Sequence, residues 1–253
     1  MDPRRGAERR LRPQPSRVIH LKGFYTSDRL GRAGTHLKLG VFDLENTLIF
    51  NEFLPELAAL VGKEAEVAAI TRAGIDGRID WEEGFRLRAQ LLKGLTQAQV
   101  LRAARHLRPV PGAPEFMEFL RSQGHKVVLI TGGPREVAES AMAFFEADAV
   151  YSNEFRYEDG IFTGEVVVAV SPRTKGAIVR DLAERWGVRK EDILAFADGL
   201  MDVPLLSEAG TRLGIRSEGK LRDHVDFETS DYEEAHRWLE GKGALPRKTK
   251  DEP

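Results

Sequence analysis

The stretch LKLGVFDLENT, residues 37–47, joins a short apolar run to two closely spaced acids, Asp43 and Glu45. The apolar residues predict a buried β-strand over 37–42 that ends directly before Asp43. Ligands of open α/β sheets bind at the carboxyl ends of the strands. We therefore expect both acids at a binding edge of a sheet, although one acid alone at this position is often only a structural cap.

Strand-like and helix-like segments alternate along the rest of the chain. Strands are predicted over 126–130, 149–151, 193–197 and 211–215, and helices over 115–123, 134–145, 172–186 and 203–209. Residues 155–170 alternate in polarity around Asp159-Gly160, which predicts a hairpin turn. Repeated alternation of strand and helix indicates an α/β fold built on a Rossmann-like parallel sheet.

Residues 52–107 interrupt this alternation with helical patterns and no convincing strand. We interpret them as a helical cap domain inserted into a core of residues 37–51 and 108–240. The Arg-rich residues 1–36 lack hydrophobic periodicity, so we expect a disordered basic tail or a start codon assigned too far upstream. The polar residues 241–253 are expected to form a frayed tail.

The composition excludes several classes of protein. The 38 Lys and Arg residues nearly balance 40 Asp and Glu, and a net charge of −2 argues against nucleic-acid and anionic-membrane partners. The absence of cysteine excludes disulfides, thiol nucleophiles and Cys-based metal sites, and it fits a cytoplasmic protein. No apolar run approaches the ~18 residues of a membrane-spanning helix.

Three of the predicted strands end in polar residues that can meet at one edge of the sheet: Asp43, Thr131 and Asp198. The glycines after Thr131 allow backbone N–H groups to approach a phosphate at the start of the next helix. Asp202 follows Asp198 closely, so this edge gathers several carboxylates, and oxygen-only ligands favour Mg²⁺. The pattern therefore predicts a phosphate and magnesium site.

The order of these segments resembles the haloacid dehalogenase-like phosphohydrolases, and within them the phosphoserine phosphatase branch. Four motifs of that family are matched across roughly residues 38–230: a DxDxT-like segment at Asp43–Thr47, the pair Thr131-Gly132, Lys175, and a GDGxND-like segment at Ala197–Asp202. Each motif is weak alone, but four in the same order at compatible spacing rarely arise by chance. The resemblance implies the family's α/β core with an inserted helical cap.

The resemblance also implies roles for individual residues. Asp43 would be the nucleophile that takes up the phosphoryl group as an aspartyl-phosphate, and Glu45 would be the general acid. Mg²⁺ would be held by Asp43, the backbone carbonyl of Glu45, Asp198 and, through water, Asp202. The phosphoryl oxygens would be bound by Thr131, the N–H group of Gly132, and Lys175.

Lys175 is supported by an independent argument. On the helix predicted over 172–186, it shares one face with apolar residues: Ile178, Val179, Leu182 and Trp186. A lysine on the apolar face, in the first turn of a helix, points toward the interior. The alternative is a lysine whose stem is buried while its amine reaches solvent.

The predicted cap contains three candidate substrate-binding residues, Glu52, Trp81 and Arg88. Arg88 lies on the apolar face of a helix together with Trp81 and Phe85, whereas Arg86 faces away. A buried guanidinium needs a carboxylate partner, from the protein or from a substrate. By the resemblance, the segment Trp81–Arg88 ends in the arginine that binds the substrate carboxylate, and Glu52 matches the acid that binds the substrate amine. For Glu52, an ordinary first-turn helix acid is the alternative.

Three positions depart from the family pattern. Glu45 replaces a second aspartate and adds one methylene, and a displacement of ~1 Å can cost ~100-fold in rate. Met201 replaces an asparagine near the phosphoryl group, and Ala197 replaces a glycine. These changes allow a slow, retuned or inactive enzyme.

The sequence thus predicts a Mg²⁺-dependent phosphomonoesterase that acts on phosphoserine, a small phosphorylated metabolite. This function would place it in serine biosynthesis, as a cytoplasmic monomer or homodimer. Two alternatives stay open: a phosphatase of the same fold for another small phosphorylated metabolite, and a catalytically impaired, ligand-binding relative. A haloacid dehalogenase is disfavoured because Lys175, Asp198 and Asp202 together imply a metal.

Overall fold

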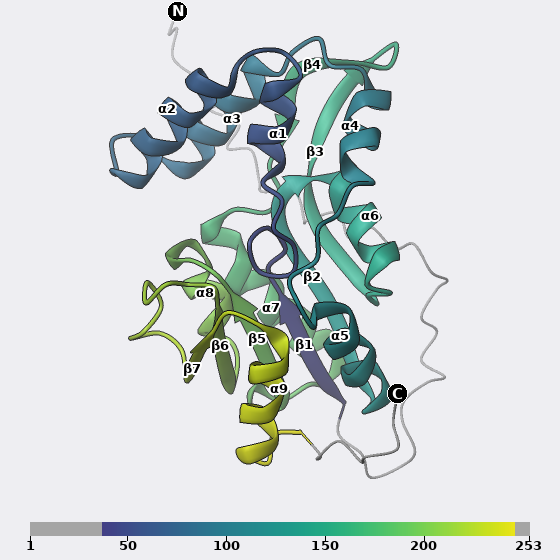
Figure 1. Ribbon diagram of the computed structural model, residues 1–253, viewed down its shortest axis with the longest axis vertical. Coiled ribbons are helices and arrows are strands. Elements are labelled where there is room, and N and C mark those ends of the chain that lie inside the picture. The colour runs from purple at the N-terminus through teal and green to yellow at the C-terminus, as the bar shows by residue number, and fades with distance from the viewer. Residues whose placement is uncertain (1–36, 246–253) are drawn as a thin grey trace, which may run out of the picture.

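The computed structural model describes residues 37–245, so the tail expected over 1–36 and residues 246–253 lie outside the described part. A seven-stranded sheet has the order β4-β3-β2-β1-β5-β6-β7, and all neighbouring strands are parallel except β3 and β4 (Figure 1). The strands are β1 (Lys38–Phe42), β2 (His125–Pro134), β3 (Ala149–Glu158), β4 (Ile161–Val167), β5 (Ile193–Ala197), β6 (Thr211–Ile215) and β7 (Phe227–Thr229). The predicted α/β fold with a largely parallel sheet is confirmed.

Helices cover both faces of this sheet. The helices of the described chain are α1 (Phe53–Ala59), α2 (Glu64–Ile75), α3 (Trp81–Leu91), α4 (Gln97–Ala104), α5 (Ala113–Ser122), α6 (Arg135–Phe144), α7 (Pro172–Trp186), α8 (Val203–Leu206) and α9 (Tyr232–Gly241). Helices α5, α6 and α9 pack on the face that carries Phe42 and Leu129, whereas α7 and α8 pack on the face that carries Val41 and Ile130. Among the described residues, no helix combines the length and the apolar character needed to span a bilayer.

The predicted core elements are present, and three of them have the expected bounds. Strands β5 and β6 and helix α7 coincide with their predicted ranges, and the turn at Asp159-Gly160 joins β3 to β4. Strand β2, however, continues to Pro134, whose backbone is extended, so α6 begins at Arg135 rather than at Pro134. Strand β3 is a single ten-residue strand, longer than the one predicted over 149–151. Strand β7 and helix α9 are absent from the predicted elements.

The residues directly after α9 pack onto the core, although we expected fraying from residue 241 onward. Gly243 adopts a positive φ of 71°, a left-handed conformation that ends many helices. The N–H groups of Ala244 and Leu245 then donate to the carbonyl of Leu239. This return of the chain buries Leu245, which is only 4% exposed, in the core beside α9.

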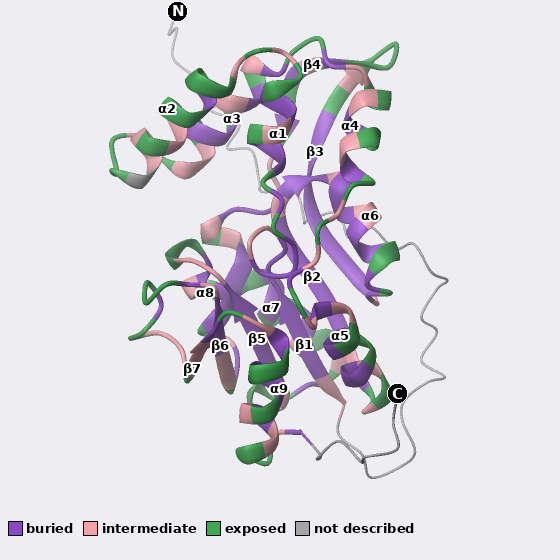
Figure 2. Cartoon of the chain, in the orientation of Figure 1, coloured by how far each residue is buried: buried purple, intermediate pink, exposed green. Residues whose placement is uncertain are grey.

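Helices α1, α2 and α3 gather at the end of the molecule that also carries the β3–β4 hairpin (Figure 1). Leu57, Val67 and Phe85 from these helices share one hydrophobic cluster with Phe155 and Phe162 from the hairpin. Figure 2 shows exposed residues on the outward sides of these helices and mostly buried residues in the central strands β1, β2 and β5. Residues 52–107 contain helices and no strand, as predicted. The expected domain boundaries remain a prediction, and the hairpin shares the cap's hydrophobic cluster.

Candidate active site

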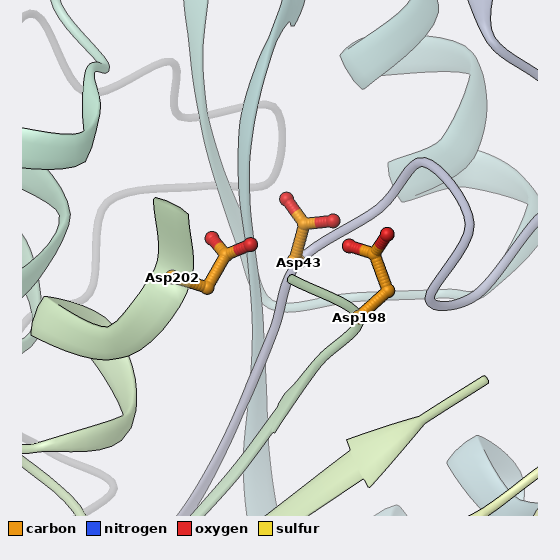
Figure 3. A group of neighbouring side chains, drawn as sticks. All are labelled: Asp43, Asp198 and Asp202. Carbon is orange, nitrogen blue, oxygen red and sulfur yellow. The ribbon is translucent and has the colours of Figure 1, made fainter. Parts of the chain in front are cut away.

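Three carboxylates meet at the carboxyl edge of the sheet, where the sequence predicts a metal site. Asp43 follows β1 and Asp198 follows β5, two strands that are direct neighbours. Asp202 lies on a 3₁₀ turn, Leu200–Asp202, that leads into α8. One carboxylate oxygen of each of the three residues lies within 4.8 Å of the others. Figure 3 shows the three side chains next to one another at the ends of these segments.

The side chain of Lys175, which belongs to helix α7, also reaches this cluster. Helix α7 begins after Ser171, which forms a capping box with Thr174, and Lys175 lies in its first turn. The buried Nζ atom of Lys175 donates to Oδ1 of Asp43 at 2.7 Å and also to Oδ1 of Asp202. The amine therefore points inward, as its place on the apolar face predicts. It does not follow the alternative, in which the stem is buried and the amine reaches solvent.

The cluster carries more negative than positive charge. Burial, together with the charges of Asp43 and Asp202, raises the pKa of Asp198 to about 8. Burial also raises the pKa of Asp202 to about 6, against the lowering effect of Lys175. For Lys175 itself, burial acts to lower the pKa, but the charges of Asp202 and Asp43 outweigh it and raise the pKa.

These donors fit a hard divalent cation. All three side chains offer carboxylate oxygens, the ligand type that Mg²⁺ and Ca²⁺ prefer. Burial and the neighbouring negative charges both disfavour the ionised form of these carboxylates, and a cation that joins them offsets both effects. We conclude that the site can hold a divalent metal ion, and that Lys175 supplies only one of the positive charges it needs.

The loop after β1 is held in place from two directions. The hydroxyl of Thr47 donates to Oδ2 of Asp43 at 3.2 Å, so Thr47 and Lys175 each bond one oxygen of that carboxylate. The fully buried Tyr232 of α9 donates its hydroxyl to the backbone carbonyl of Thr47 at 3.1 Å. The orientation of Asp43 thus depends on a helix near the C-terminus of the described chain.

The predicted phosphate-binding residues Thr131 and Gly132 lie in a bulged loop near the carboxyl end of β2, between the paired residues Ile130 and Pro134. Thr131 is buried, and its Oγ1 accepts a hydrogen bond from the N–H group of Gly133 at 2.9 Å. Trp81 from α3 lies directly on Gly132, because a Cβ atom there would be 2.9 Å from Cζ2 of the indole. Gly132 therefore permits this approach of the cap helix, and any larger residue would push it away.

Glu45 lies between this loop and the start of α1. Its Oε1 accepts a hydrogen bond from the N–H group of Phe53 at 2.8 Å. Burial raises the pKa of Glu45 to about 7, and Asp43 and Glu52 add to this effect while the Phe53 N–H group opposes it. The carboxyl group is thus protonated more readily than an ordinary glutamate, as a proton donor requires.

The cavity above the cluster is also lined by the candidate substrate-binding residues Glu52, Trp81 and Arg88. Arg88 is half-buried, and it donates from Nε to the carbonyl of Gly84 at 3.1 Å. Burial lowers its pKa, against the charges of Glu45 and Glu52. Exposed Glu52 accepts a hydrogen bond from Asn46 at 2.9 Å. All the candidate residues therefore meet around one cavity or directly beside it.

The two other departures from the family pattern have different surroundings. Met201 lines the cavity with 45% of its surface exposed, so an apolar side chain stands at the rim where the family has an asparagine. Ala197 is fully buried in β5 and pairs with Gly214 of β6 in regular parallel register. Ala197 therefore fits within an intact strand, and its methyl group does not disrupt the ladder.

Sequence reasoning missed three groups of residues near the site. Asn153 of β3 bonds the carbonyl of Gly132, and Tyr232 bonds the loop after β1. Arg173 in the first turn of α7 forms an ion pair of 2.6 Å with Asp80, the N-cap of α3. No motif marks these residues, because each acts through a partner that is distant in sequence.

The comparisons with curated proteins agree with this geometry. A phosphoserine phosphatase of Halobacterium salinarum is 34% identical over 209 residues, which cover 82% of this chain and 99% of that protein. A phosphoserine phosphatase of Methanocaldococcus jannaschii is 30% identical over 191 residues, 75% of this chain and 90% of that protein. The phosphoserine phosphatase SerB2 of Mycobacterium tuberculosis is 34% identical over 201 residues, but the match spans only 49% of its length.

Solved structures also resemble this chain in fold. A structure described as a phospho-aspartyl intermediate analogue of phosphoserine phosphatase superposes with a TM-score of 0.75 at 28% identity, covering 81% of this chain and 99% of that one. The model of the family described as haloacid dehalogenase-like hydrolase matches residues 41–207, which include Asp43, Thr131, Lys175, Asp198 and Asp202. This chain therefore belongs to the haloacid dehalogenase-like hydrolase family.

Proposed function

We propose that this chain hydrolyses phosphoserine through an aspartyl-phosphate on Asp43. Its class, a phosphatase, follows from the family and from the named relatives. The observation that carries the proposal is the contact of Asp43 with Lys175, beside Asp198 and Asp202, at the floor of a cavity that also holds Arg88. A nucleophile, a cation site and a carboxylate-binding group thus surround one space.

Mg²⁺ is the cation that we propose for this site. Its ligands would be Asp43, the backbone carbonyl of Glu45, Asp198 and, through water, Asp202. When bound, the ion neutralises the negative charge of the phosphoryl group and so allows a carboxylate to approach it. Small size and a preference for carboxylate oxygens make Mg²⁺ the usual partner of phosphate chemistry.

The steps of the proposed hydrolysis would be carried out by side chains of this protein. An oxygen of Asp43 attacks phosphorus while the bond from phosphorus to the serine oxygen breaks. Glu45 gives its proton to that leaving oxygen, and it then takes a proton from the water that attacks the aspartyl-phosphate. Thr131, the N–H group of Gly132 and Lys175 would hold the phosphoryl oxygens. The hydroxyl of Thr131 accepts a hydrogen bond from Gly133, and a hydroxyl that accepts can still donate its own hydrogen.

The cap side of the cavity supports an amino-acid leaving group. The guanidinium of Arg88 would pair with the substrate carboxylate, and Glu52 would pair with the ammonium group. The rings of Trp81 and Phe85 stack with their centroids 5.3 Å apart in the cavity wall, where they exclude water. Serine biosynthesis, a cytoplasmic location and a monomer or homodimer remain predictions from the sequence.

One observation favours a second candidate, a catalytically impaired relative that binds a ligand. Glu45 already accepts the hydrogen bond of the Phe53 N–H group at 2.8 Å, and this bond orients its carboxyl group toward α1. A carboxyl group held there reaches a leaving oxygen only when its second oxygen or its proton faces the cavity. The two candidates differ in turnover and not in binding.

A substrate panel tests the proposal. Phosphate release would be measured with Mg²⁺ for four compounds: L-phosphoserine, phosphoethanolamine without the carboxylate, 3-phosphoglycerate without the amine, and p-nitrophenyl phosphate. We expect the highest kcat/KM for L-phosphoserine and a loss of about tenfold or more for each compound that lacks one charged group. Equal values for all four would contradict phosphoserine as the substrate. Binding of phosphoserine without turnover of any compound would favour the impaired relative.

A further inference from the structure

We propose that Asn153 is a positioning residue that fixes the peptide group between Gly132 and Gly133, and with it the phosphate-binding loop. This inference rests on the proposed function, because it concerns how the phosphoryl group is held. Asn153 belongs to none of the motifs, and it is neither one of the three clustered carboxylates nor a residue that lines the cavity. It would act only through the loop that it orients.

The need for such a residue comes from a bulge in the sheet. Strands β2 and β3 pair regularly up to Ile130 and Tyr151, and the next pair is Pro134 with Asn153. Strand β2 thus carries two more residues than β3 over this stretch. A bulge of this kind takes residues out of the ladder, so Thr131, Gly132 and Gly133 need other partners for their peptide groups.

The side chain of Asn153 supplies such a partner. It is fully buried, and its Nδ2 donates to the carbonyls of Gly132 and Val170, each at 2.9 Å. Its Oδ1 accepts from the N–H groups of Ala169 and Val170, each at 2.8 Å. A carboxamide has two donor hydrogens and two acceptor lone pairs, and all four are used here. The pattern also fixes which atom is nitrogen, because only carbonyls face one and only N–H groups face the other.

The peptide between Gly132 and Gly133 is consequently held at both ends. Asn153 bonds its carbonyl at 2.9 Å, and Oγ1 of Thr131 bonds its N–H group at 2.9 Å. These two groups point in opposite directions because the peptide is planar and trans. Glycines on both sides would otherwise let the peptide rotate freely. A rotated peptide would turn the carbonyl of Gly132 toward Oγ1 of Thr131 and would break both of these hydrogen bonds, so the loop that carries Thr131 and Gly132 would lose its geometry.

The same side chain ties the loop to Lys175. Residues 169 and 170, which Asn153 bonds through both of its polar atoms, directly precede the N-cap of α7. The hydroxyl of Thr174 donates to the carbonyl of Ala169 at 3.1 Å. The N–H group of Lys175 donates to the carbonyl of Ser171, also at 3.1 Å. Asn153 therefore sets the distance between two groups expected to bind the same phosphate, Gly132 and Lys175.

The test compares Asn153→Asp with the wild-type enzyme. The aspartate keeps the size of the side chain and the two bonds accepted from residues 169 and 170, but its second oxygen repels the carbonyls of Gly132 and Val170. We expect the inhibition constant of inorganic phosphate to rise about tenfold and kcat/KM for p-nitrophenyl phosphate to fall by about 10- to 100-fold. Values within twofold of the wild type for both quantities would overturn the inference.

Asn51→Asp is the matched control. Asn51 is also buried, and its amide bonds the carbonyl of His106 at 3.1 Å and the N–H group of Arg108 at 2.8 Å, away from the phosphate loop. The substitution Asn51→Asp should lower the Tm, while the inhibition constant of phosphate stays at the wild-type value. If Asn153 had a purely structural role, Asn153→Asp would likewise lower the Tm and leave the inhibition constant of phosphate unchanged. That result would also overturn the inference.

A measurement on the unmodified protein completes the test and does not depend on the folding of a variant. The two Nδ2 protons of Asn153 should exchange slowly with solvent in NMR spectra and should shift when inorganic phosphate is added with Mg²⁺. Fast exchange, as for an exposed asparagine, would contradict the inference. If the wild-type protein hydrolyses no phosphomonoester, the proposed function fails, and this exchange measurement still decides whether Asn153 holds the loop.

Discussion

The Nζ atom of Lys175 lies 2.7 Å from Oδ1 of Asp43, although 132 positions separate the two residues in the chain. Both side chains are buried, so water does not weaken the attraction between them. The same amine also contacts Asp202. One lysine thus joins the proposed nucleophile to the proposed metal site, and its removal would affect binding, stability and metal dependence together.

Replacing this lysine should expose the excess negative charge of the cluster. Lys175→Met keeps most of the apolar stem but leaves Asp43 and Asp202 buried without their cation. We expect a loss of about 3–5 kcal/mol in the free energy of unfolding, measured by urea denaturation in chelator. Mg²⁺ should restore part of this stability, because it would replace the missing positive charge.

Lys126→Met provides the comparison for that measurement. Lys126 forms an ion pair of 2.7 Å with Asp148, but 30% of its side-chain surface is exposed and the pair is outside the carboxylate cluster. The expected loss is at most about 1 kcal/mol, without any recovery on addition of Mg²⁺. Equal losses for the two variants, or no effect of Mg²⁺ on Lys175→Met, would show that Lys175 does not balance a cation site.

Arg88 should determine the choice of substrate and not the rate of the chemical step. Arg88→Ala removes the guanidinium from the cavity, so KM for L-phosphoserine should rise at least about tenfold. Hydrolysis of p-nitrophenyl phosphate, which has no carboxylate, should change little. Steady-state kinetics on both substrates would check this expectation.

Arg86→Ala is the natural control, because Arg86 lies on the same helix and is exposed. It donates to Glu82 at 2.7 Å and to the carbonyl of Val166 at 3.1 Å, away from the cavity. Its replacement should leave both KM values unchanged. A parallel loss on both substrates for Arg88→Ala would instead mean that Arg88 is structural and holds α3 against α2 through Thr71.

That these candidate residues gather at one edge of the sheet could be predicted from the sequence, because they obey local rules. Asp43 and Asp198 follow strands that are recognisable from their apolar residues, and Thr131 follows the apolar run of β2; parallel strands bring their carboxyl ends to one edge. Lys175 was placed by the period of its own helix. For these residues, local pattern and topology together were sufficient.

Other features could not be predicted because they depend on contacts between distant segments. The extension of β2 to Pro134 depends on pairing with Asn153, and nothing in the local sequence indicates that partner. The short β7 and the amphipathic α9 carry no motif, although Tyr232 of α9 bonds the carbonyl of Thr47, 185 positions earlier. The contact of Trp81 with Gly132 likewise appears only when cap and core are in place.

Glu45 is expected to be the general acid despite its extra methylene. Glu45→Ala should slow the hydrolysis of phosphoserine by ~10²–10⁴-fold, because an alkoxide leaves poorly without a proton. It should slow p-nitrophenyl phosphate much less, since that leaving group needs little protonation. Glu45→Asp should retain or raise the activity on phosphoserine if the shorter acid still reaches the leaving oxygen.

The comparison of these two variants with the wild type decides between an active and an impaired enzyme. All three proteins would be assayed on both substrates at saturating Mg²⁺. If wild type and Glu45→Ala are equally slow on phosphoserine while Glu45→Asp is much faster, Glu45 is not the acid. The hydrogen bond from the Phe53 N–H group would then explain why its carboxyl group is held away from the substrate.

His125 should make the fold sensitive to acid, independently of the active site. Burial, with the nearby charge of Lys38, lowers the pKa of His125 to about 4 from its ordinary value of 6.5. The unfolded chain therefore binds a proton at higher pH than the folded protein. This contribution to stability is fully present above pH ~6.5 and is lost as the pH falls toward 4, by about 3 kcal/mol.

His125→Leu removes the titrating group and should reduce the loss of stability between pH 7 and 4 by that amount. The quantity to measure is the difference in the free energy of unfolding between variant and wild type, obtained from urea denaturation at several pH values. Buried carboxylates contribute equally to both proteins and cancel in this difference. An identical pH dependence of the two proteins would show that His125 is not held neutral in the fold.

The central claim, that Asp43 and its neighbouring carboxylates form a metal-dependent phosphatase site, is tested most directly by phosphate release from L-phosphoserine. The assay compares the wild type with Asp43→Asn, each with Mg²⁺ and with excess chelator. We expect release only from the wild type with Mg²⁺, and at least a ~10³-fold loss in the other three samples, while circular dichroism shows both proteins folded. Undiminished turnover by Asp43→Asn, or by the wild type in chelator, would contradict the account.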